Sequence, residues 1–189
     1  MTLYLNRKES ALVMPTTVPE TGLFLHAAAV LGPDGVILLM GHSSSGKTTL
    51  SSMISNRYPI VADDLVFAFP SRDGAWKIMN GQLLKTEAEL YRHGATERLF
   101  KEGAAYPLRS LIRIFAAERS ILRPLSPVKL CEYLMDAVFE ISTQSRHTDI
   151  NSRNLWFRAA ANIARQYPGW WMQFFLNERF AVDMIRQTT

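Results

Sequence analysis

The stretch LMGHSSSGKTTLSS, from residue 39 to residue 52, holds the residue types best suited to chemistry. Its spacing matches the pattern G-x-x-x-x-G-K-[ST]. In such a loop, backbone N–H groups at the start of a helix point at phosphate oxygens, the lysine adds positive charge, and the threonine hydroxyl is a Mg²⁺ ligand. A glycine-serine turn can also lack any function, but the apolar run before this loop and the amphipathic pattern after it favour nucleotide binding. The expected contact residues are Gly41, His42, Ser43, Ser44, Ser45, Gly46, Lys47, Thr48 and Thr49.

Ser44 stands where loops of this pattern often carry glycine. If the backbone at this position has a positive φ, a serine there is strained, because its Cβ crowds the neighbouring backbone. We therefore expect a loop shaped somewhat differently from one with glycine at this position, with its backbone donors retained.

Two adjacent carboxylates, Asp63 and Asp64, follow the loop by about one helix and one strand. That separation brings the end of a neighbouring strand beside the loop. Adjacent side chains at a strand end point to opposite sides, so one can hold Mg²⁺ while the other accepts a proton from an attacking hydroxyl. Such pairs alone are often solvated turns, but the preceding phosphate loop favours the functional interpretation.

His26 lies in the apolar segment FLHAA. A lone histidine in such a strand is more often a core residue with its hydrogen bonds satisfied than a catalyst. Taken alone, His26 therefore leaves both interpretations open.

The elements that must position these residues follow from apolar periodicity. Strands are predicted over 23–31 and 36–40, and the Pro33-Asp34-Gly35 turn joins them in a hairpin. A helix is predicted directly after the loop, since Leu50, Met53 and Ile54 have helical spacing. Further strands are predicted over 60–62, 65–69, 75–78, 108–115 and 170–176, and further helices from Pro127, over 154–166 and over 178–186. The helix from Pro127 has Ser126 as its cap, and its predicted core face is Cys131, Leu134, Met135, Val138 and Phe139.

The composition indicates one globular domain, which we place over residues 1–189, with 48% hydrophobic and 20% charged residues. The net charge of +4 fits an anionic nucleotide, and we expect no nucleic-acid partner. The single cysteine, Cys131, excludes an intrachain disulfide and favours a cytoplasmic location. No apolar run approaches the roughly 18 residues of a membrane span, so we expect no membrane association.

Three segments, LHAAAV, GVILLMGHSSSGKTTLSS and IVADDLVF, together resemble the nucleotide-binding core of the HPr kinase/phosphorylase family. Relatives of that family include ATP-dependent phosphoenolpyruvate carboxykinase. The later segments RPLSPVKLCEYLMDAVFEI and AAANIARQYPGWWMQFFL are similar to the C-terminal part of small stand-alone HPr kinase-like proteins, some of which resemble kinases of lasso-peptide precursors. The resemblance implies an α/β fold, with a mixed sheet, flanking helices and a P-loop kinase core of the HPr kinase/phosphoenolpyruvate carboxykinase type.

The same resemblance implies an ATP-dependent, Mg²⁺-dependent kinase that transfers the γ-phosphoryl group to a serine hydroxyl of a small protein or peptide. It makes His26, Lys47 and Asp64 the catalytic residues, with Asp64 as the base. Thr48 and Asp63 are then the metal-binding residues. It also implies that copies of the chain form a homo-oligomer.

Two alternatives remain beside the kinase: a non-catalytic or regulatory nucleotide-binding module, and a small-molecule enzyme of the carboxykinase branch. The short stretch before Gly41 leaves little room for the upstream substrate site of the latter. The L-E-x-R-G signature of the bifunctional HPr enzymes is absent, which puts the reverse, phosphorylase reaction in doubt. An arginine that neutralises the transferring phosphoryl group is expected, and the candidates are Arg92, Arg98 and Arg109.

Overall fold

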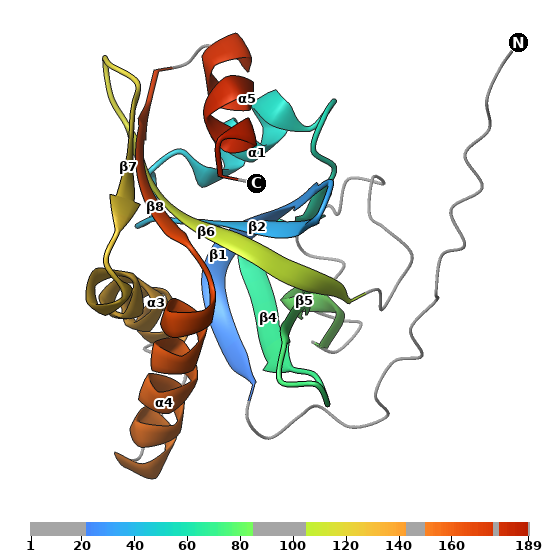
Figure 1. Ribbon diagram of the computed structural model, residues 1–189, viewed down its shortest axis with the longest axis vertical. Coiled ribbons are helices and arrows are strands. Elements are labelled where there is room, and N and C mark those ends of the chain that lie inside the picture. Colours follow the sequence, from blue (N-terminus) through green and yellow to red (C-terminus); the bar gives the residue numbers. More distant parts are fainter. Residues whose placement is uncertain (1–21, 85–104, 143–149, 176–177, 189) are drawn as a thin grey trace, which may run out of the picture.

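The computed structural model describes residues 22–84, 105–142, 150–175 and 178–188. These residues form a mixed α/β fold in which helices flank a mixed sheet (Figure 1). The elements are β1 (Leu23–Gly32), β2 (Gly35–Met40), α1 (Lys47–Ile54), β3 (Ile60–Ala62), β4 (Leu65–Pro70), β5 (Trp76–Asn80), the 3₁₀ helix η1 (Gly81–Leu84), β6 (Tyr106–Ala116), β7 (Ile121–Leu125), α3 (Pro127–Ser142), α4 (Ile150–Gln166), β8 (Gly169–Phe174) and α5 (Glu178–Arg186).

The two long strands, β1 and β6, each pair with different strands along their length. Residues 23–26 of β1 pair with β4, and residues 27–32 pair with β2. The start of β6 pairs with β5, and the rest pairs with β2 on one side and β8 on the other. The pairings β1–β4–β5–β6–β2 therefore close a ring, from which β8 and β7 extend the sheet.

The central strand β2 is buried at all six of its residues, GVILLM. It lies between β1, which runs antiparallel to it, and β6, which runs parallel. A continuous apolar run is typical of a strand covered on both faces. The predicted hairpin is confirmed, because Gly32 and Gly35 form the last pair of β1 and β2 before the turn.

Helices cover the sheet on both faces. Figure 1 shows α1 and α5 together on one side, and α3 and α4 together on the other. The apolar core beneath α1 and α5 includes Leu50, Ile54, Ile112, Met172 and Ile185. A second core beneath α3 and α4 includes Leu38, Met40, Leu111, Leu134 and Ile163. The phosphate-loop segment 41–46 follows the carboxyl end of β2 and leads into α1.

Helix α3 begins as predicted, since the N–H of Lys129 donates to Ser126 Oγ at 3.3 Å. Cys131, Leu134 and Val138 are buried on its core face, whereas Met135 and Phe139 are only partly buried. None of the described helices is both long and apolar enough to cross a membrane.

Three elements differ from the prediction, one of which is the 3₁₀ helix η1, for which no element was predicted. Strand β7 was not predicted; it carries an exposed Arg123-Pro124 pair, which sequence patterns assign to a loop, yet it pairs with β8 at one edge of the sheet. Helix α4 begins at Ile150 rather than Asn154, since its first turns are polar and exposed and show no apolar face. The poorly patterned segment 86–105 lies outside the described residues except for Ala105.

Candidate phosphate-binding and acid–base site

The phosphate loop and the aspartate pair lie on opposite sides of β1. Ala27 of β1 pairs with Met40, the residue before Gly41, and its N–H donates to Asp64 O at 3.3 Å. The neighbouring His26 pairs with Leu65 of β4. His26 lies inside β1, where that strand changes partner from β4 to β2. The predicted proximity of the aspartate pair to the phosphate loop is confirmed, because Asp63 contacts Thr48, and Asp64 also contacts His26.

Glycine is required at both ends of the loop for steric reasons. A Cβ on Gly41 would lie 2.1 Å from Ser45 Oγ, because the N–H of Ser45 turns back to donate to His42 O at 3.0 Å. Gly46 has a φ of +95°, and a Cβ there would meet the Phe174 ring at 2.8 Å. The loop is therefore wound tightly against itself and against β8.

Ser44 adopts the left-handed backbone suspected from the sequence, with a φ of 66°. A non-glycine residue in this region costs on the order of 1–3 kcal/mol. At Ser44 the loop therefore has a backbone conformation that favours glycine, and the backbone is strained at this serine.

Helix α1 begins with its backbone donors uncapped. Gly46 is the N-cap residue and provides no side-chain hydrogen bond, and the first turn contains no acidic residue. The N–H groups of that turn, together with the positive end of the helix dipole, suit a phosphate group.

Lys47 is folded back onto its own loop. Its Nζ donates to Gly41 O at 2.7 Å and to His42 O at 3.3 Å, and the residue is only 6% exposed. Burial lowers the pKa of Lys47, against the opposing charges of Glu140 and Asp64. The ammonium is thus held at the loop and directed toward its centre.

Asp63 faces the start of α1. Thr48 Oγ1 donates to Asp63 Oδ1 at 3.3 Å. Burial raises the pKa of Asp63, and the hydrogen bond from Thr48 opposes that shift. No group of three or more His, Cys, Asp or Glu side chains in the described ranges could hold a metal ion alone. A hydroxyl beside a carboxylate fits Mg²⁺ that takes its other oxygen ligands from a nucleotide and water.

Asp64 turns away from its neighbour. Its side chain is 70% exposed, and Oδ1 lies 3.0 Å from His26 Nε2. The two carboxylates diverge as predicted, but the predicted reason, strand alternation, is wrong. Neither residue is in a strand, and Asp64 has a φ of 82°, which redirects its side chain.

Glu140, near the end of α3, is a site residue that the sequence did not reveal. One of its oxygens, Oε2, contacts His26 Nδ1, and the other, Oε1, lies 2.8 Å from His42 Nδ1. Burial alone would raise the pKa of Glu140, but the hydrogen bond with His42 and the nearby His26 and Lys47 lower it below its usual value. The signal in the sequence was a lone glutamate between Phe139 and Ile141.

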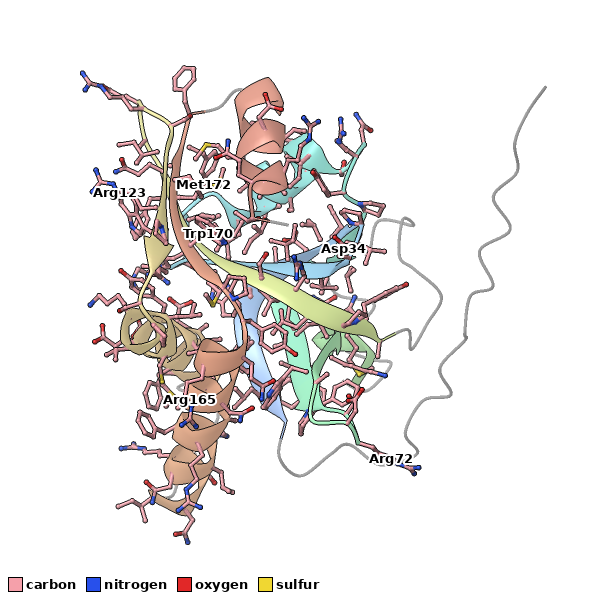
Figure 2. The ribbon with its side chains drawn as sticks, in the orientation of Figure 1. Asp34, Arg72, Arg123, Arg165, Trp170 and Met172 are labelled. Atoms are coloured by element: carbon pink, nitrogen blue, oxygen red, sulfur yellow. The ribbon has the colours of Figure 1, made fainter. Side chains whose placement is uncertain are left out.

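Of the three arginine candidates, Arg109 is the one that the structure describes, and it is not brought to the site. Arg109 is exposed and lies beside the turn between β1 and β2, with its Cβ 3.3 Å from the place a Cβ on Gly35 would take. Asp34 marks this turn in Figure 2, at the end of β2 opposite the phosphate loop. Arg92 and Arg98 lie outside the described residues.

No protein-family model matches the chain, and no curated protein sequence is significantly similar to it. Solved structures do match. One of them is described as the HPr(Ser) kinase/phosphatase from Coxiella burnetii, with 13% sequence identity, a TM-score of 0.36, and coverage of 55% of this chain and 71% of that chain.

Proposed function

We propose that this chain is an ATP- and Mg²⁺-dependent kinase that transfers the γ-phosphoryl group of ATP to a serine hydroxyl of a small protein or peptide. The observation that carries the proposal is the meeting of the phosphate loop with the aspartate pair and His26 across β1. The serine acceptor and its small carrier rest on the sequence resemblance to HPr kinase-like proteins.

The phosphate loop supplies the binding groups for the nucleotide. The uncapped N–H groups of α1 donate to the phosphates. Lys47 Nζ leaves the carbonyl oxygens of the loop and donates to phosphate oxygens instead. Thr48 and Asp63 would hold Mg²⁺, which supplies charge neutralisation at the phosphates when bound. Nucleotide binding is thus assigned to the phosphate loop, and metal positioning to Thr48 and Asp63, which meet across β1.

Asp64 acts as the base in the transfer. The serine oxygen bonds to the γ-phosphorus while the bond from that phosphorus to its bridging oxygen breaks, ADP leaves with the bridging oxygen, and the hydroxyl proton passes to Asp64. A side chain that is 70% exposed can reach an acceptor presented from solvent. His26 contacts both Asp64 and Glu140, so it holds the base and links it to a second carboxylate.

The test combines ATP binding with transfer. Wild-type protein and Lys47→Ala are titrated with Mg²⁺–ATP by calorimetry, then incubated with a degenerate serine peptide library and with a matched library in which alanine replaces serine. We expect phosphoserine only with wild type and the serine library. Loss of the lysine removes a charge-assisted contact, so ATP affinity falls by roughly ten- to a hundredfold.

Lys77→Ala, a lysine on β5, is the matched control and should behave as wild type. Unchanged ATP affinity in Lys47→Ala contradicts the phosphate-loop assignment. Tight ATP binding by wild type without transfer to either library supports the regulatory nucleotide-binding module instead.

A further inference from the structure

Arg113, on β6, is a buried arginine with no role in the mechanism above. The residue is 2% exposed, and its Nε is enclosed without a hydrogen-bond partner. Within residues 22–84, 105–142, 150–175 and 178–188, no carboxylate forms an ion pair with it. A guanidinium removed from water without a counter-ion is unfavourable. Its retention is explained if an anion that the described residues do not supply joins it.

Two aromatic rings hold this guanidinium in place. Arg113 Cζ lies 4.8 Å from the centre of the Tyr133 ring and 5.4 Å from that of Phe115. Ring faces attract a cation, but they compensate for lost water less well than an anion does. Because Nε of Arg113 is enclosed, the two terminal nitrogens of the guanidinium, Nη1 and Nη2, are the atoms that can contact a ligand.

The position of Arg113 is next to the phosphate loop. It is in register with Met40, which directly precedes Gly41. Because β6 runs parallel to β2, the next residue along β6 reaches the loop: Ile114 O is 3.2 Å from the place a Cβ on Gly41 would take. The Arg113 charge also acts at Lys47, where burial is the main cause of the lowered pKa and Arg113 adds to it.

We propose that Arg113 forms an anion subsite beside the phosphate loop and that this subsite binds a phosphate group. The inference rests on the nucleotide binding proposed above. A planar guanidinium fork matches two phosphate oxygens at once. The phosphate comes either from the γ-position of ATP or from the phosphorylated acceptor, and the two sources give different results in the same experiment.

The test is calorimetry on the full chain with three probes. Wild type and Arg113→Met are titrated with Mg²⁺–ADP, with Mg²⁺ and a non-hydrolysable ATP analogue, and with inorganic phosphate after saturation by Mg²⁺–ADP. If the γ-phosphate occupies the subsite, affinity for the ATP analogue falls by roughly ten- to a hundredfold while ADP affinity is unchanged. If the acceptor's phosphate occupies it, only the binding of inorganic phosphate is lost.

Thermal unfolding without ligands separates this role from packing. Methionine fills the aromatic site without a charge to desolvate, so the melting temperature of Arg113→Met should equal or exceed that of wild type. Three unchanged titrations overturn the subsite. So does an equal loss of ADP and ATP-analogue affinity accompanied by a lower melting temperature, which assigns Arg113 to packing.

Arg123→Met is the matched control. Arg123 Cζ lies 5.9 Å from the centre of the Trp171 ring, but the residue is exposed, and Figure 2 shows it on β7 at the outer edge of the sheet. This variant should bind all three probes as wild type does. If Arg113→Met does not fold, Arg113→Lys replaces it: the lysine keeps the charge and loses the fork, so a smaller loss is expected, and unchanged affinities overturn the subsite.

Lys47→Ala, measured in parallel, separates this inference from the proposed function. If Lys47→Ala binds the ATP analogue as tightly as wild type, the nucleotide site itself is rejected. If Lys47→Ala loses that binding while Arg113→Met keeps all three affinities, the subsite alone is rejected.

Discussion

The two loops that flank β1 at His26 are built by different means. The phosphate loop, residues 41–46, takes its shape from backbone requirements: two sterically required glycines, a strained Ser44 and a turn closed by the main-chain hydrogen bond from Ser45 to His42. The aspartate turn, residues 63–64, works through side chains, and their partners come from α1, β1 and, through His26, α3.

This difference indicates a division of labour. Main-chain donors are kept on substitution by any residue except proline, so the phosphate loop should tolerate change at several positions and still bind. The aspartate turn depends on individual side-chain atoms, so a single substitution there should affect chemistry far more than binding. The predictions below test that contrast from the largest expected effect to the smallest.

Asp64→Asn should have the largest effect. Asparagine tolerates a positive φ and keeps the shape of the side chain, but it cannot accept the proton. We expect phosphoryl transfer to fall by about 10²–10⁴-fold with Mg²⁺–ATP affinity nearly unchanged. Single-turnover transfer and calorimetry on the same preparation measure the two quantities.

Asp63→Asn is the comparison within the same turn. It weakens the metal site, so added Mg²⁺ should restore part of its activity. If Asp63→Asn is instead inactive at every Mg²⁺ concentration and metal rescues Asp64→Asn, the roles of the two aspartates are reversed. Equal and mild effects from both substitutions would show that the aspartate pair is a solvated turn without a catalytic role.

Glu140→Gln should have an intermediate effect, visible in stability. The folded pKa of Glu140 lies below its ordinary value of 4.5, so its charged form stabilises the fold. That contribution is complete above the unfolded pKa and is lost as the pH falls through the lower folded value. We expect Glu140→Gln to cost about 1 kcal/mol at neutral pH, and the difference from wild type to shrink below the ordinary pKa.

Denaturant unfolding over a pH series measures this difference. Glu132→Gln is the control, because Glu132 is on the same helix but is exposed and paired with Lys129 at the surface. A Glu140 difference that stays constant to the lowest pH would show that its charge does not stabilise the site.

Ser44→Gly should have the smallest effect, and of opposite sign. Glycine relieves the strained φ but makes the unfolded chain more flexible, so we expect a net gain of about 0.5 kcal/mol with nucleotide affinity retained. Ser43→Gly is the matched control; its φ is not positive, so it should lose stability. Equal losses from both variants would show that Ser44 is not strained.

The strands and helix around the phosphate loop follow from local signals. Apolar runs and the Pro33-Asp34-Gly35 turn predict β1, β2 and β3 to within one residue. The glycine and lysine spacing likewise predicts the loop before α1. These features depend on neighbours in the chain, which a sequence pattern records directly.

The remaining site features depend on contacts that no local pattern records. His42 and Glu140 are 98 residues apart in sequence, and α3 brings them together only when it packs on the sheet. Arg113 is part of an apolar strand pattern, and nothing in that pattern indicates that its charge lacks a partner. The positive φ of Asp64 is equally hidden, since aspartate is only moderately favoured in that region.

The change of partner along β1 has a consequence for how the chain can vary in length. Backbone register sets the spacing between the phosphate loop and the aspartate turn, so residues added to the connection just after α1, over 55–57, where no residue is buried, can be accommodated at the surface. One residue inserted between His26 and Ala27 would reverse the facing of every side chain on one half of the strand relative to the other half. Insertions accumulated over evolutionary time should therefore avoid residues 23–32 and collect in that connection.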